Sequence, residues 1–147
     1  MSVFIFAAMK FLHLNFLPRS ADAALLLLRI WHGGAMFLLH GWGKLIGFSA
    51  MAPNFADPIG IGKTPSLMLV VLAEVVCAAL LVAGLFTRVA ALVAAINMGV
   101  AFWLAHGGKL SGPGNGEMAF LFLGVYGSLF IAGGGKFSLD AKLGAKT

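Results

Sequence analysis

Residues 66–86 read SLMLVVLAEVVCAALLVAGLF, and this run carries a single charged side chain, Glu74. About 20 predominantly apolar residues in an α-helix are enough to span the hydrocarbon core of a bilayer. Runs of similar character lie on either side, at about residues 22–43, 88–106 and 117–132. The sequence therefore predicts an all-α fold, a transmembrane four-helix bundle.

Composition favours this fold class over a water-soluble domain. Hydrophobic residues make up 61% of the chain and charged residues 10%, whereas soluble domains carry about 25% charged residues. A soluble chain of this size could not bury so much apolar surface. The net charge of +5 comes from scattered Lys and Arg side chains rather than a dense basic cluster. We therefore expect the lipid bilayer as a partner, and no nucleic acid.

The bundle is flanked by short regions at both termini. Residues 1–18 are apolar and rich in Phe, but Lys10, His13 and Asn15 interrupt them. This pattern is typical of an interfacial segment that lies along the membrane surface, rather than of a cleavable signal peptide. We therefore predict an apolar interfacial segment at residues 1–18, a transmembrane domain at residues 19–140 and a cytoplasmic tail at residues 141–147.

The connections indicate how the bundle is oriented. Residues 84–88, GLFTR, predict a tight antiparallel hairpin, whereas the long loops 45–65 and 107–116 fall together on the opposite side. Lys and Arg gather in cytoplasmic regions. Those on the side of the termini are Lys10, Arg19, Arg88, Lys136, Lys142 and Lys146, and they outnumber Lys44, Lys63 and Lys109 on the other side. We expect a multi-pass inner-membrane protein with both termini in the cytoplasm.

Ionisable side chains inside the apolar runs require partners, because a charge in lipid is costly. In the first run Arg29, His32, His40 and Lys44 recur at helical spacing, and they share one face with Gly33, Met36 and Gly43. Counting ~1.5 Å of rise per residue places His32 and Glu74 at similar depths, with Arg29 nearer the cytoplasmic end and able to reach them by its long stem. We expect these three to form one polar cluster, in which Glu74 and His32 relay protons. A structural ion pair that fixes helix register is the alternative.

Further polar residues are expected near the outer boundary of the bundle. His40, Lys44, His106 and Glu117 fall at about the same level, and either converge into a ligand-binding mouth or are solvated separately among the headgroups. Asn97 in the third run is expected to hydrogen-bond between helices. Cys77 is expected to be a small buried apolar side chain.

The sequence predicts no metal site, since it contains neither an HExxH nor a CxxC motif. His32 and His40 lie eight residues apart on one helix. Their separation of about 12 Å prevents them from sharing an ion. Only His40 with His106 could ligate haem from facing helices, and we do not expect haem.

Four motifs stand in order over about residues 25–140, namely Arg29 with HGWGK at 40–44, Glu74 with GLFTR at 84–88, NGE at 115–117, and GGGKFSLD at 133–140. Together they resemble the motifs of the DoxX family of four-helix membrane proteins. The positions that match the family's pattern are Arg29, His40, Lys44, Glu74, Arg88, Glu117 and Asp140.

The resemblance implies a redox setting near the quinone pool, because some members of the family resemble subunits of thiosulfate:quinone oxidoreductase. We therefore expect a membrane subunit of a quinone-linked redox complex, with a small apolar ligand such as quinone in a polar-lined pocket. The expected ligand-binding residues are Arg29, His40, Lys44, His106 and Glu117, and the expected structural polar residues are Asn97, Arg88 and Asp140.

Other functions remain open at this point. The chain has no cofactor motif of its own, so another redox subunit would have to supply electrons, and a homo-oligomer is a further candidate assembly. The main alternative is a non-enzymatic membrane anchor or assembly partner for a soluble redox enzyme. A small-solute transporter has less support, because four spans without an evident inverted repeat are few for alternating access.

Overall fold

The computed structural model describes residues 9, 12–14 and 16–145, and within them every regular element is helical, as predicted. Three helices are long and apolar enough to cross a membrane: the first helix Ala21–Ile46, the second helix Lys63–Ala83 and the third helix Thr87–Ala105. A shorter apolar helix spans Glu117–Ala132. Much of the predicted interfacial segment at residues 1–18 lies outside the described residues.

Each of the three long helices contains a π-helical turn. The first helix comprises α2 (Ala21–Ala35), η1 (Met36–Gly41) and α3 (Trp42–Ile46), and the second comprises α5 (Lys63–Val71), η3 (Leu72–Cys77) and α6 (Ala78–Ala83). The third helix joins α7 (Thr87–Val100) to η4 (Ala101–Ala105), and the fourth is α8 (Glu117–Ala132). Short helical turns lie in the connections, at α4 (Phe48–Met51), η2 (Ala52–Asn54) and α9 (Leu139–Lys142).

The helix boundaries agree with the sequence pattern except at the long loop between the first two helices. There the first helix continues one turn past residue 43, and the second begins at Lys63, which places Pro65 in its first turn. Proline is tolerated in that turn because the first amides of a helix have no helical acceptor. The predicted hairpin forms at Gly84, whose φ of 70° ends α6.

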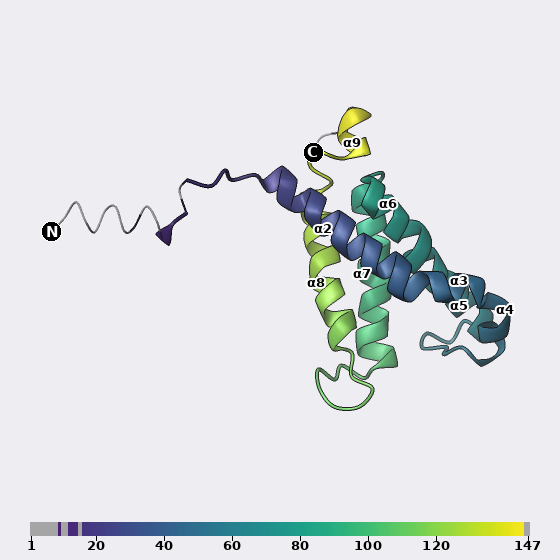
Figure 1. The fold of residues 1–147 in the computed structure, drawn as a ribbon. Helices are drawn as coiled ribbons and strands as arrows, with labels where there is room; N and C mark the ends of the chain where they lie inside the picture. Colours follow the sequence, from purple (N-terminus) through teal and green to yellow (C-terminus); the bar gives the residue numbers. More distant parts are fainter. Residues whose placement is uncertain (1–8, 10–11, 15, 146–147) are drawn as a thin grey trace.

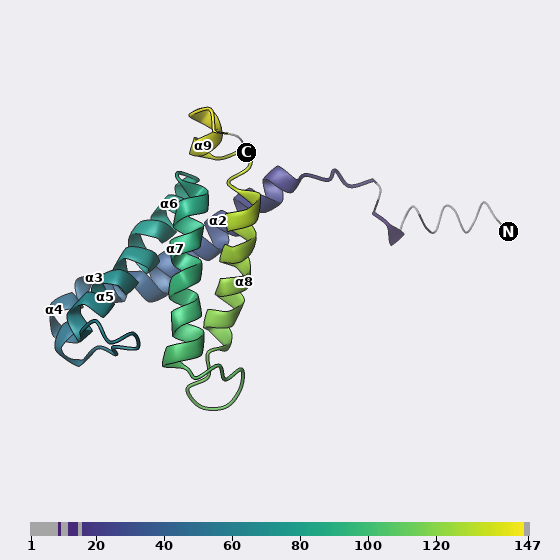
Figure 2. The same ribbon diagram turned by 180° about the vertical axis from the view of Figure 1, so that it is seen from behind.

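The four apolar helices pack into one bundle (Figures 1 and 2). The antiparallel helices α7 and α8 lie side by side in both views, and the first helix runs obliquely across α6 and α8. One end of the bundle holds the start of α2, the α6–α7 turn and α9, and we call it the terminal end. The opposite end, the loop end, holds the 107–116 loop and the segment between α3 and α5.

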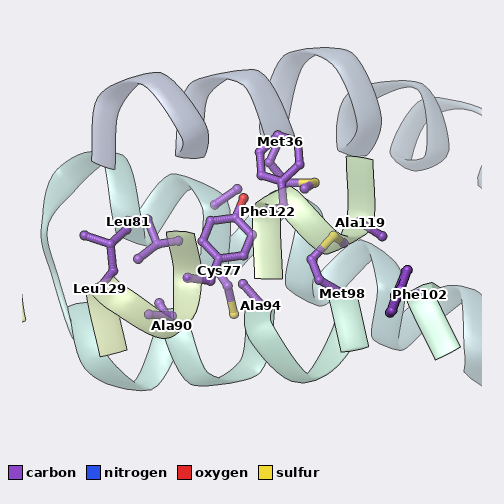
Figure 3. Close-up of a cluster of buried hydrophobic side chains, with 13 residues drawn as sticks. Met36, Cys77, Leu81, Ala90, Ala94, Met98, Phe102, Ala119, Phe122 and Leu129 are labelled. Atoms are coloured by element: carbon purple, nitrogen blue, oxygen red, sulfur yellow. The ribbon is translucent and has the colours of Figure 1, made fainter. Parts of the chain in front are cut away.

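Side chains from all four helices meet in the core (Figure 3). The buried cluster includes Met36 from the first helix, Leu81 from the second, Ala94 from the third and Phe122 from α8. The opposite face of the first helix exposes Leu27, Trp31 and Leu38. Lipid tails are as apolar as these side chains, so close packing and interhelical hydrogen bonds must hold the helices together.

Arg29 provides such hydrogen bonds at the terminal end, where its side chain is fully buried. Its guanidinium donates to the carbonyl oxygens of Leu81 at 3.3 Å, Val82 at 3.4 Å and Phe137 at 2.8 Å. The Leu81 and Val82 carbonyls belong to the last turn of α6, where carbonyl groups lack the usual helical donors, and the Leu81 carbonyl also accepts from the Gly84 amide at 3.1 Å. Arg29 therefore caps α6 and ties the segment after α8 to the bundle.

Glycine at position 84 makes this cap geometrically feasible. A Cβ atom there would overlap the guanidinium of Arg29, and the φ of Gly84 lies in the left-handed region that side chains disfavour.

Gly124 on α8 has open space where a Cβ would be. We expect Gly84→Ala to lower the free energy of unfolding by about 2–4 kcal/mol through backbone strain and overpacking. Thermal unfolding in detergent measures this, with Gly124→Ala as the control; equal stability of the two variants would contradict it.

Asp140 caps the start of the third helix from outside the membrane-spanning segments. Its carboxylate accepts hydrogen bonds from the backbone amides of Phe86 at 2.7 Å and Thr87 at 2.8 Å. Partial burial by itself raises the pKa of Asp140, but these hydrogen bonds and the charge of Arg29 outweigh burial and lower the pKa. The C-terminal segment is therefore held at the α6–α7 turn by a carboxylate that must be ionised.

This lowered pKa predicts how the contribution of Asp140 depends on pH. A group whose folded-state pKa lies below its unfolded value of about 3.9 stabilises the fold above that value, and the stabilisation is lost as pH falls through the folded pKa. We expect Asp140→Asn to cost about 1 kcal/mol at neutral pH. The difference between wild type and variant in thermal unfolding should stay constant from about pH 7 to about pH 5 and shrink below about pH 4. A difference that persists in acid would argue against the ionised cap.

Candidate functional site

An ion pair joins the first and second helices inside the bundle. The ammonium Nζ of Lys44 lies 2.5 Å from Oε2 of Glu74, and it also donates to the carbonyl oxygen of His40 at 3.2 Å. The side chain of Glu74 is 8% exposed and that of Lys44 is 23% exposed. Both groups lie within helices that could span the membrane. Each is therefore the partner that the other requires in a low-dielectric environment.

Local backbone geometry brings the two helices close enough for this pair. Gly41 ends the π-helical turn η1 and packs against the carbonyl group of Glu74, where a Cβ atom could not be accommodated. Glu74 itself lies in the π-helical turn η3. A π-helical turn shifts the register of the side chains that follow it, and such turns are frequent at functional sites. The crossing of η1 and η3 therefore positions the ion pair.

Beside the ion pair lies a cavity of about 360 Å³, which we call the ion-pair cavity. Its walls come from the second and third helices and from the loop before α5. Most lining side chains are apolar, and the polar exceptions are Lys44, Ser66, Glu74, Asn97 and His106. An apolar cavity with a few convergent polar groups is the usual form of a small-molecule site.

His106 contributes an imidazole at the loop end of this cavity. Its Nδ1 lies 2.9 Å from the carbonyl oxygen of Gly114, within the loop between the third helix and α8. A carbonyl can only accept, so in this hydrogen bond Nδ1 is the protonated nitrogen and Nε2 is left for another partner. The cavity thus combines a carboxylate, an ammonium and an imidazole, which are groups able to hydrogen-bond and exchange protons with a ligand.

Comparison with known proteins places this fold in a family. The DoxX family model matches residues 24–107, which is more than half of the 147-residue chain. The chain belongs to the DoxX family. A Haemophilus influenzae protein, described as an uncharacterized protein, is 31% identical over 115 residues that cover 73% of this chain and 81% of that protein. No solved structure matches the chain.

The matched DoxX region holds every polar residue that lines the ion-pair cavity. The first three helices lie almost entirely within it, whereas α8 and the closing motif at 133–140 lie beyond its end. The cavity is therefore built mainly from the part of the chain that defines the family.

The predicted cluster of Arg29, His32 and Glu74 does not form, and that interpretation was wrong. Arg29 extends toward the terminal end to cap α6, while Glu74 pairs with Lys44 nearer the loop end. Counting helical rise from a common plane failed because the first helix crosses the bundle obliquely, so equal rise does not mean equal depth (Figure 1). Both charges nevertheless face the interior of the bundle, as predicted.

The two histidines of the first helix lie against α8 rather than in the cavity. The rings of His32 and His40 contact the Phe122 ring edge-on, with centroids 5.8 Å and 5.9 Å away. His32 Nδ1 lies 3.2 Å from the Leu28 carbonyl oxygen, and Tyr126 donates its hydroxyl to the carbonyl oxygen of His32. Neither imidazole is therefore placed to relay protons to Glu74 by direct contact.

The remaining predicted residues divide between the cavity and the helix ends. Of the expected outer mouth, Lys44 and His106 line the cavity, whereas Glu117 is exposed at the start of α8. Asn97 lines the cavity, and its side-chain amide makes no hydrogen bond to another described residue, so the predicted bond between helices does not form there. Arg88 donates to the Phe130 carbonyl oxygen and stacks on the Phe130 ring, which joins the third helix to α8.

Sequence reasoning missed the direct pairing of Lys44 with Glu74, although it singled out both residues. No helix breaker stands between Gly43 and Ile46. That absence was the available signal that the first helix continues through Lys44. The contribution of the loop residues Phe55 and Pro58 to the cavity had no comparable signal, because only the folded loop brings them to the third helix.

The ion pair makes the stability of the bundle depend on both charges together. Lys44→Met leaves the Glu74 carboxylate buried and unpaired, and we expect a loss of about 2–4 kcal/mol in the free energy of unfolding. The double variant Lys44→Met/Glu74→Gln removes both charges and should recover most of that loss. Thermal unfolding of the single and double variants in detergent measures the coupling, and strictly additive losses would contradict a direct ion pair.

Proposed function

We propose that this DoxX protein is an inner-membrane subunit of a quinone-linked redox complex and that it binds the quinone ring in the ion-pair cavity. The observation that carries the proposal is an ion pair with unused hydrogen-bonding capacity beside an apolar cavity. Lys44 has three N–H donors and uses two of them within the described residues. Oε1 of Glu74 has no hydrogen-bond partner among these residues. The unused donor can hydrogen-bond to a ring carbonyl group, and the unused acceptor can hydrogen-bond to the hydroxyl group that forms when the ring is reduced.

The chemistry of the proposed step divides between the chain and a partner. Reduction of a quinone to a quinol takes up two electrons and two protons and leaves a hydroxyl group on each ring oxygen. The DoxX chain has no redox cofactor motif, so a partner redox subunit supplies the electrons. Lys44 donates a hydrogen bond to one ring carbonyl, and Glu74 carries protons to the ring oxygen. His106 exchanges protons at the loop end of the cavity.

The charge distribution supports an orientation for the complex. Among the described residues, the exposed basic side chains at the terminal end are Arg19, Arg88, Lys136 and Lys142, and those at the loop end are Lys63 and Lys109. By the positive-inside rule, the terminal end faces the cytoplasm. The ion-pair cavity then lies toward the outer leaflet. Another redox subunit donates the electrons, and it binds either one copy of this chain or a homo-oligomer of it.

Quinone retention tests the proposal directly. We expect wild-type protein purified in mild detergent to retain quinone. Glu74→Gln and the double variant Lys44→Met/Glu74→Gln should retain about tenfold less, since a hydrogen bond to a charged group contributes about 1.5–3 kcal/mol. Ser128→Ala is the matched control, because that exposed hydroxyl donates to the Gly124 carbonyl within α8, away from the cavity. Extraction and chromatography of the bound quinone, per mole of folded protein, give the readout.

Activity of the assembled complex separates the proposed role from a purely structural one. The Glu74→Gln complex should lose quinone-dependent electron transfer while keeping its normal subunit content. A wild-type protein without quinone, together with full activity in Glu74→Gln, would overturn the proposal. That result would instead favour a non-enzymatic anchor for a soluble redox enzyme.

A further inference from the structure

The sides of the ion-pair cavity differ in what covers them. Toward the bundle centre, the lining residues Ala73 and Glu74 are buried. Between the second and third helices, the lining residues Leu69, Leu72 and Ile96 are 48%, 44% and 59% exposed. These three lie on helices that could span the membrane, and their exposed surfaces would face lipid. We call this side the lateral mouth, because it opens sideways from the bundle.

The loop end of the cavity is covered by a segment that we call the roof, residues 55–59. Phe55, Ala56, Pro58 and Ile59 of the roof line the cavity, and all four are apolar. In Figures 1 and 2 the segment before α5 extends from the second helix toward the loop end of α7. Apart from His106 and Ser66, the cavity therefore presents apolar side chains on its side nearest the headgroups and water.

Hydrogen bonds fix the roof to the start of the second helix. Asp57 accepts from the amides of Ile61 at 3.0 Å and Gly62 at 2.8 Å, and from the hydroxyl of Ser66 at 2.8 Å. Hydrogen bonds from Ser66 and Gly62, the largest contributions, keep the pKa of this carboxyl below its usual value. Lys63 adds a hydrogen bond to the carbonyl oxygen of Pro53 at 3.1 Å. Asp57 therefore anchors the roof to the start of the second helix, and Lys63 anchors the segment just before the roof, so we infer that the roof is a cover rather than a route for ligands.

We propose that the ligand of this cavity is a membrane-resident amphiphile that enters through the lateral mouth. Its polar ring lies at the ion pair, and its apolar tail remains outside, between the second and third helices and the lipid. This inference rests on the proposed function and adds the access route and the ligand class. A water-soluble ligand approaching through the roof is the alternative that it excludes.

The size of the cavity supports a ligand divided in this way. About 360 Å³ lies near the lower limit of the ~300–1,000 Å³ typical of small-molecule sites. A ring-sized head group fills such a volume and leaves no room for a long apolar tail. A tail that remains between the helices contacts lipid and apolar side chains, so no desolvation cost arises there.

Ligand exchange in a lipid membrane distinguishes the lateral mouth from the roof. The full chain is reconstituted in phosphatidylcholine vesicles with unlabelled ubiquinone, and isotopically labelled ubiquinone is then added to the membrane. Mass spectrometry of the bound ligand gives the exchange rate. Ile96→Trp narrows the mouth and should slow exchange about tenfold, whereas Ile96→Ala should accelerate it. Occupancy at equilibrium should change less than the rate does, because a steric gate slows binding and release together.

Two further variants serve as controls. Ile131→Trp adds the same bulk on α8, where Ile131 is 79% exposed and does not line the cavity. Asp57→Ala removes the hydrogen bonds that hold the roof, and Asp57 does not line the cavity. Both variants should exchange ubiquinone within about twofold of wild type. Faster exchange in Asp57→Ala with unchanged rates in both Ile96 variants would overturn lateral access while leaving quinone binding intact. Absence of bound ubiquinone in wild type would overturn the proposed function and this inference together.

Discussion

A charge inside the hydrocarbon core needs a partner within reach of its side chain, and this requirement organises both ends of the bundle. At the terminal end, the guanidinium of Arg29 donates to backbone carbonyl oxygens of the last turn of α6 and of the closing segment. Toward the loop end, Lys44 and Glu74 neutralise each other. These contacts hold the oblique first helix against its neighbours, where apolar packing alone gives little directional preference in lipid.

The two ends are linked because a charged side chain that is paired at one end of the bundle is not available as a partner at the other end. Both terminal nitrogens of the Arg29 guanidinium donate to carbonyl oxygens, whereas the Glu74 carboxylate pairs with Lys44. Lys44 reaches it because the first helix continues beyond Gly43 and because Gly41 allows close approach to the backbone of the second helix. The π-helical turns η1 and η3 meet at this crossing. The position of the polar centre is therefore a consequence of backbone packing as much as of charge.

An ion pair of this kind stabilises the fold and still leaves hydrogen-bonding capacity beside the cavity. Purely structural pairs in a membrane are expected to be enclosed, since unused polar groups in hydrocarbon are costly. Here the pair adjoins a cavity whose other walls are mostly apolar and whose lining residues between two helices are exposed. In the function that we propose, this combination holds the polar ring of a membrane-resident ligand at the ion pair and leaves the apolar tail outside.

The sequence by itself determined the helical class, the hairpin at Gly84, the inward-facing stripe of the first helix and the limits of α8, because these follow from hydrophobic periodicity and local backbone preference. It also singled out Lys44, Glu74 and His106. Only the tertiary structure decided that Glu74 pairs with Lys44 rather than Arg29, that His32 and His40 pack on Phe122, and that the roof closes the cavity. Rise along a helix gives depth only for parallel axes, and an oblique crossing is set by side-chain packing between segments distant in sequence.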